Sequence, residues 1–132
     1  MSVDYTFNMQ QLYAIFKSND LNNIVIHYVT PCTSFFSKFR GLMFKTNLAE
    51  NEGILLIQEK SNKIDSAIHM LFMNFDISVF WLDTNFFVVD KTIAKKWRPF
   101  YIPKHNAKYV LETHPRIFSM INIGDQLSFE EI

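Results

Sequence analysis

Short apolar runs rich in β-branched and aromatic residues, separated by polar turn formers, dominate the chain. The first two runs are LYAIFK (12–17) and NIVIHYVT (23–30), and the intervening SNDLN favours a turn. We therefore expect an antiparallel hairpin. Alternation gives its second strand two largely apolar faces, so we expect this strand to be covered on both sides. The two faces comprise Ile24, Ile26 and Tyr28 on one side and Val25, His27 and Val29 on the other.

A four-residue spacing replaces the alternation in TPCTSFFSKFRGLMF (30–44). Phe35, Phe39 and Met43 form an apolar stripe of the kind that an amphipathic helix carries. Thr33 or Ser34 can cap its beginning. Gly41 either ends this helix or allows it to pack closely against a strand.

The rest of the pattern again predicts strands, at 53–58, 67–73, 77–83, 86–93, 107–113 and 124–129. A turn at DTN precedes the fourth of these ranges, with Asn85 as the residue expected to be left-handed. The two prolines of KKWRPFYIPKHN (95–106) make that segment irregular, and 115–122 can form a short helix. About eight strands and one or two short helices predict a mostly β (α+β) fold. We expect a single domain over residues 1–132, built as a compact, barrel-like antiparallel or mixed sheet.

Composition narrows the class of protein. Thirteen basic and thirteen acidic residues cancel among 132, without a basic stripe, so nucleic-acid binding is not expected. Cys32 is the only cysteine, which excludes an internal disulfide and a cysteine metal array. No secretion signal is visible and no apolar segment approaches the ~20 residues of a membrane span. We therefore expect a soluble cytoplasmic protein.

Six motifs in series carry a family resemblance: FSKFRGLMF, EGILLI, IHMLFMNFDISVFWLD, KKWRP, YVLE and IGDQLSF. In order and spacing they resemble the domain of unknown function family 192, from about residue 12 to 129. The resemblance implies a small β-rich fold of bacteria and archaea with no established activity. The residues that match are Arg40, Gly41, His69, Met73, Asp83, Trp97, Arg98, Glu112, Gly124 and Asp125.

The chain also departs from the family pattern. Where the family reads a proline and then an acid, as in FPIDVVFLD, this chain has Asp76 and Ser78. A basic residue often found just before is Asn74 here, and the family's PAG is replaced by HPR (114–116). If the family's acid belongs to a ligand or charge-pair site, this chain has lost or rebuilt that site.

His69 lies in the apolar run IHMLFM (68–73), which allows two interpretations. Thioether and imidazole groups from Met43, Met70, Met73 and His69 suit Cu(I). Methionine is also an ordinary core residue that packs well on aromatic rings, and the chain holds fourteen phenylalanines. We favour the core interpretation and expect no metal and no other cofactor. We also expect His69 to be buried at least partly and hydrogen-bonded, with Glu112 or Asp83 as the first carboxylates to consider.

The segment KKWRPFYIPKH (95–105) is the best candidate for a site, because binding residues concentrate on such loops. Arginine beside aromatic walls suits carboxylates, phosphates or sugars. The proposed ligand-binding residues are Arg40, His69, Trp97, Arg98 and Tyr101. Residues expected to be structural are Gly41, Met43, Met73, Asp83, Glu112, Gly124 and Asp125.

These features favour a non-catalytic domain that binds a small polar or anionic ligand, or a partner protein, through residues 97–101. No nucleophile elbow, phosphate-binding glycine loop or HExxH pair is present. Two alternatives stay open. The first is an enzyme that uses His69 with a carboxylate such as Glu112, and the second is a purely structural or accessory protein.

Overall fold

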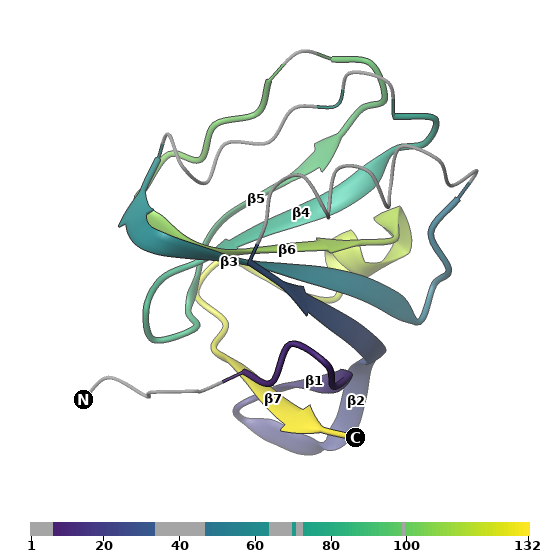
Figure 1. The fold of residues 1–132 in the computed structure, drawn as a ribbon, viewed down its shortest axis with the longest axis vertical. Helices are drawn as coiled ribbons and strands as arrows, with labels where there is room; N and C mark the ends of the chain where they lie inside the picture. Colours follow the sequence, from purple (N-terminus) through teal and green to yellow (C-terminus); the bar gives the residue numbers. More distant parts are fainter. Residues whose placement is uncertain (1–6, 34–46, 64–69, 71–72, 99) are drawn as a thin grey trace.

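A computed structural model describes residues 7–33, 47–63, 70, 73–98 and 100–132. Seven strands form one mixed sheet in the order β5-β4-β6-β3-β2-β1-β7 (Figure 1). The elements are β1 (Tyr13–Lys17), β2 (Asp20–Cys32), β3 (Glu52–Asn62), β4 (Ile77–Leu82), β5 (Val88–Ala94), β6 (Ala107–Thr113), the 3-10 helix η1 (Pro115–Ser119) and β7 (Leu127–Glu131). The mostly β prediction is therefore confirmed.

Local turn chemistry explains two of the strand pairings. The expected hairpin is present, with β1 antiparallel to β2, and β4 and β5 form a second hairpin. β3 joins the two halves of the sheet, because it pairs in parallel with β2 and antiparallel with β6. Gly53 permits this junction: a Cβ there would lie 3.2 Å from the Glu112 carbonyl oxygen and 3.3 Å from Thr113 Cγ2.

Strand alternation divides the core into two clusters on opposite faces of the sheet. The Phe80 cluster lies on one face and also contains Ile15, Leu55 and Leu111. The Trp81 cluster lies on the other face of β3, β4 and β6 and also contains Leu56 and Val110. Loop residues complete this second cluster, namely Leu48, Met70 and Met73, with Phe75 and Tyr101 packed against it.

The barrel-like expectation needs a correction, because the sheet does not close. β7 pairs along its whole length with β1. Among the described residues, one isolated bridge, between Phe87 and Gln126, joins the residue before β5 to the residue before β7. Three backbone bonds reinforce this contact, from Val88 N to Asp125 O, Gly124 N to Val88 O and Leu127 N to Phe86 O. The edges β5 and β7 thus touch at one point and do not form a ladder.

The expectation that the second strand is covered on both sides is wrong. Ile24 is 42% exposed and Tyr28 is 44% exposed, whereas Ile26 and Val29 are fully buried. Register shifts in the β1–β2 pairing change the simple alternation, so the buried residues are three apart. Ile26 and Val29 of β2 belong to the Phe80 cluster, and the end of the strand, at Cys32, packs against the Trp81 cluster.

The turn before β5 also differs from the prediction: Phe86 has the positive φ, at 67°, and Asn85 does not. Asp83 Oδ1 accepts hydrogen bonds from the N–H groups of Asn85 and Phe87, which fixes the turn. The Phe86 ring is 1% exposed and stacks on Tyr109 with centroids 4.5 Å apart. Burial of this ring in the core therefore selects the left-handed backbone at Phe86.

The expected strand at 67–73 does not appear at its described residues, since neither Met70 nor Met73 belongs to a strand. Met73 N donates to Met70 O, and Met70 also exchanges backbone bonds with residues 97 and 98. The predicted helix that carries Phe35, Phe39 and Met43 lies outside the described residues. No helix in the described part of the chain is long and apolar enough to cross a membrane.

Candidate functional site

The irregular segment 95–105 follows β5 and is held to the body by backbone bonds. Trp97 N donates to Met70 O at 2.9 Å, and Met70 N donates to Arg98 O at 3.1 Å. Trp97 has a φ of 68°, which costs an L-residue roughly 1–2 kcal/mol. The two bonds to Met70 offset that strain and hold the backbone of Trp97 and Arg98 in place.

Side chains anchor the same segment at two further points. The Tyr101 hydroxyl accepts from Lys95 N at 2.7 Å, while its ring packs against the Trp81 cluster. Asp90, which is 8% exposed, accepts from Lys91 N at 2.9 Å and from Lys104 N at 2.9 Å. The segment lacks regular structure, yet its backbone is fixed at both ends.

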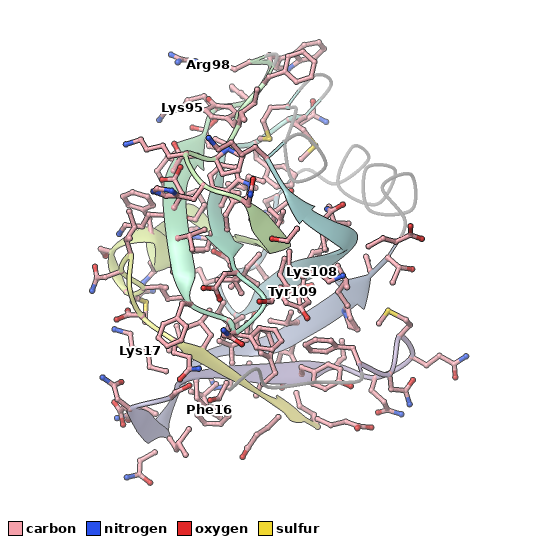
Figure 2. All side chains as sticks on the ribbon, turned by 90° about the vertical axis from the view of Figure 1, so that its left-hand side faces the viewer. Phe16, Lys17, Lys95, Arg98, Lys108 and Tyr109 are labelled. Carbon is pink, nitrogen blue, oxygen red and sulfur yellow. The ribbon has the colours of Figure 1, made fainter. Side chains whose placement is uncertain are left out.

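Large apolar side chains project from this anchored segment into solvent. Trp97 is 53% exposed, Phe100 is 67% exposed and Ile102 is 54% exposed. Arg98 is exposed between them, and Figure 2 shows it with Lys95 at the end of the molecule far from Phe16 and Lys17. We call Trp97, Arg98, Phe100 and Ile102 the Trp97 surface.

A pocket of about 260 Å³ lies beside the segment, where β4 begins and β6 ends. The described residues that line it are Asn47, Leu48, Phe75, Asp76, Lys96, His114 and Pro115. Asp76 Oδ1 accepts from Lys96 N at 2.8 Å, and Asp76 Oδ2 lies 3.5 Å from Lys95 Nζ. His114 Nδ1 accepts from Arg116 N at 3.0 Å. We call this space the His114 pocket.

The five proposed ligand-binding residues fall into three groups. Trp97 and Arg98 are neighbours on the exposed face of the segment. Tyr101 is half-buried and anchors the segment through its hydroxyl. Arg40 and His69 lie outside the described residues, so the grouping of all five stays a prediction.

The residues expected to be structural also occupy distinct places. Met73 is 2% exposed in the Trp81 cluster, and Glu112 is 1% exposed in β6, where its register partners are Val79 and Ile54. Asp83 fixes the turn before β5. Gly41 and Met43 lie outside the described residues.

Gly124 and Asp125 form the turn that leads into β7. Gly124 has a φ of 95°, a value that L side chains rarely adopt. Asp125 Oδ2 accepts from Asn122 N at 2.8 Å and lies 3.3 Å from Lys17 Nζ. The turn thereby connects the start of β7 to the end of β1.

Sequence reasoning missed the residues of the His114 pocket as a group. Four features depart from the family pattern, and two of them, Asp76 and the triplet 114–116, meet here through Asp76, His114 and Pro115. Ser78, another departure, donates from Oγ to the His114 carbonyl oxygen at 3.1 Å. The shared departure was the only signal, because no local spacing links Lys96 to His114.

Metal ligation receives no support from the part of the chain that the structure describes. Among these residues, no three His, Cys, Asp or Glu side chains come together as a possible metal site. His69 and Met43, two members of the Cu(I) set considered above, lie outside that part. What the geometry offers is a fixed, exposed aromatic surface and a small polar pocket.

Comparison with known proteins agrees with the family resemblance. Residues 17–129 match DUF192, described as "Uncharacterized ACR, COG1430". A UPF0127 protein of Thermococcus sibiricus is 39% identical over 99 residues, or 74% of this chain and 62% of that relative. One from Thermococcus gammatolerans is 35% identical over 115 residues, covering 85% of this chain and 73% of the relative. The chain thus spans about three-fifths of the length of the first of these relatives.

Solved structures share the fold at low sequence identity. A Novosphingobium aromaticivorans protein of unknown function superposes with a TM-score of 0.72 at 15% identity, covering 89% of this chain and 83% of that one. A Sinorhizobium meliloti protein, provisionally named a transcription regulator, has a TM-score of 0.76 at 13% identity, covering 90% and 92% of the two chains. At such identities the likeness shows the fold alone. The family match and the archaeal relatives together show that this chain belongs to the uncharacterised DUF192 (UPF0127) family.

Proposed function

We propose that this chain is a non-catalytic binding domain whose Trp97 surface docks an acidic, partly apolar segment of a partner protein. The observation that carries the proposal is the exposure of Trp97, Phe100 and Ile102, each more than half accessible, in one anchored segment. Aromatic residues and arginine are the types that protein interfaces favour. Exposed single hydrophobic residues are ordinary, but this group comes from a stretch of only a few residues.

Pre-organisation supports the same interpretation. A positive φ at a non-glycine residue persists only where the surroundings hold it, and such residues cluster at functional positions. Here the bonds to Met70 hold Trp97 at a φ of 68° while its indole stays exposed. A surface fixed in advance loses less conformational entropy when a partner binds.

Charge indicates the chemistry of the partner. Lys95, Lys96, Arg98 and Lys104 all lie in or beside the segment and are exposed. The carboxylates that contact the segment are Asp76 and Asp90, and both accept its backbone N–H groups. The excess positive charge favours an acidic segment, and the apolar side chains favour leucine or aromatic residues within it.

A peptide array tests this directly. Peptides would combine acidic or basic residues with leucine and phenylalanine, and a third set would carry acidic residues without apolar ones. We expect binding only to the acidic, apolar set, and weaker binding at higher salt because exposed charges are screened. Equal binding of basic peptides would contradict the proposal.

Matched variants separate recognition from folding. The double variant Trp97→Ala with Arg98→Ala should lose peptide binding and keep the free energy of unfolding within about 1 kcal/mol, since both side chains are exposed. Tyr28→Ala, which removes a 44% exposed aromatic from β2, serves as the control and should bind normally. If the double variant fails to fold, Trp97 contributes to the stability of the fold and not mainly to recognition.

A further inference from the structure

Apart from the Asn47 amide, which can donate or accept, the polar side chains of the His114 pocket mainly have donors left to offer. Asp76 Oδ1 already accepts the Lys96 N–H and Asp76 Oδ2 faces Lys95 Nζ, so each oxygen of this carboxylate has a partner. His114 Nδ1 is also occupied as an acceptor, by Arg116 N. A neutral imidazole in that arrangement carries its proton on Nε2, which is then a donor. Lys96 adds an ammonium group for which the described residues provide no side-chain partner.

Among the described residues that line the pocket, the charged side chains are Lys96 and Asp76. Lys95 Nζ lies 3.5 Å from Asp76 Oδ2, so these two lysines outnumber the one carboxylate in this described part of the chain. The nearby Arg116 and Glu50 neutralise each other in an ion pair of 2.6 Å. Donor groups with a net positive charge select a ligand that has only acceptors and carries negative charge.

The remaining wall is apolar. Leu48 is 3% exposed, and Phe75 and Pro115 are half-buried beside it. A volume of about 260 Å³ lies just below the range of pockets for drug-sized ligands, which begins at roughly 300 Å³. The space therefore suits a compact hydrocarbon body attached to an anionic head.

We infer that the His114 pocket binds a small organic oxyanion, a carboxylate or phosphate on a short apolar body. Lys96 and the His114 Nε2–H hold the anionic head, while Leu48, Phe75 and Pro115 cover the apolar part. This site is separate from the Trp97 surface, although the chain passes directly from one to the other at Lys96 and Trp97.

Three probes test the chemistry by NMR titration of the full chain: isovalerate, its neutral analogue isoamyl alcohol, and inorganic phosphate. We expect isovalerate to shift the amide signals of Asp76, Lys96 and Arg116, because their N–H groups or side chains border the pocket. Isoamyl alcohol should bind roughly tenfold more weakly, as it lacks the charge. Phosphate should also bind more weakly than isovalerate, because it lacks the apolar body.

Variants of the pocket residues sharpen the test. Lys96→Met should weaken isovalerate binding roughly tenfold. Lys104→Met changes an exposed lysine that lines another pocket, and it should leave isovalerate binding unchanged. His114→Asn keeps an acceptor for Arg116 N, since asparagine is a good cap, but removes the second ring nitrogen. This variant should weaken isovalerate binding several-fold, while Arg116 N still donates to the side chain at position 114.

Several outcomes would overturn the assignment. One is that isovalerate causes no localised amide shifts at the pocket. Another is that isoamyl alcohol or phosphate binds as tightly as isovalerate. The last is that Lys96→Met and Lys104→Met weaken isovalerate binding equally. The double variant Trp97→Ala with Arg98→Ala should leave isovalerate binding unchanged. Failure of the peptide array and failure of this titration are therefore distinguishable.

Discussion

Some side chains in this protein have structural roles that their residue type does not predict, and Lys91 is one of them. Lys91 lies on β5 and its Nζ donates to the carbonyl oxygens of Phe118 and Ile121, at 2.8 and 3.0 Å. The same ammonium lies 4.1 Å from the centroid of the Phe118 ring. A lysine that a sequence pattern treats as a solvated strand residue thus secures the end of η1 and the turn after it.

Lys91→Met should therefore destabilise the fold. The variant keeps the apolar stem and loses two charge-assisted bonds, so we expect a loss of about 1–2 kcal/mol, discounted for partial exposure. Urea unfolding measures it. Lys108→Met is the control, because its Nζ makes one exposed bond to Glu59 O and should change stability little. Equal losses in the two variants would contradict the role of Lys91.

Trp97 offers a second residue-scale prediction, based on its φ of 68°. Trp97→Gly and Trp97→Ala both remove the indole, but only glycine adopts this backbone conformation without steric cost. We expect the glycine variant to be more stable by about 1 kcal/mol, in contrast to the usual penalty for glycine. Thermal unfolding of the pair measures the difference, and a more stable alanine variant would show that the strain is absent.

At the scale of elements, the junction of β3 with its neighbours depends on Gly53. Its missing side chain lets the strand approach Glu112 O, Thr113 Cγ2 and Val29 Cγ2, each of which would lie within 3.4 Å of a Cβ at this position. Gly53→Ala should overpack this junction and cost roughly 1–3 kcal/mol in unfolding free energy. If Gly41 allows close helix-to-strand packing, as one of the two sequence interpretations holds, Gly41→Val carries the same expected cost. An unchanged unfolding midpoint for Gly53→Ala would show that the strands can move apart freely.

The anchored segment 95–105 gives the other element-scale prediction. Tyr101→Phe removes only the hydroxyl that accepts the Lys95 N–H. We expect a loss of about 1 kcal/mol and faster amide exchange at Lys95, while the ring packing on the Trp81 cluster persists. Peptide binding should weaken as well, because the Trp97 surface would then be less well fixed. An unchanged rate of amide exchange at Lys95 would show that the Tyr101 hydroxyl does not anchor the segment.

At the scale of the whole molecule, the two edges of the open sheet are joined by a few backbone bonds. The amides of Val88, Gly124 and Leu127 donate across this joint at 2.8, 2.8 and 3.0 Å. If the joint is part of the cooperative fold, these amides should exchange with deuterium as slowly as those of β6. The Asn85 amide, bonded only to the Asp83 side chain in the turn, should exchange faster. Rapid exchange at all three joint amides would show that the edges separate.

Much of the architecture follows from local pattern. Alternating apolar residues and turn formers specify β1, β2, β4, β5 and β6, since pleat and turn chemistry act over a few residues. The irregularity of residues 95–106 follows from its two prolines in the same way. What local pattern could not predict was the side of β2 that meets the core, because register shifts in a pair of strands depend on both partners.

The sequence by itself determined a mostly β chain, its family and one exposed candidate loop, because propensity and alternation are local properties. Only the tertiary structure decided the rest. The buried ring of Phe86 sets its own backbone, and the parallel pairing of β2 with β3 links segments far apart in the chain. The meeting of Asp76, Lys96 and His114 around one pocket likewise depends on how β4, β5 and β6 lie side by side. Such sites form from long-range contacts, which no short stretch of sequence encodes.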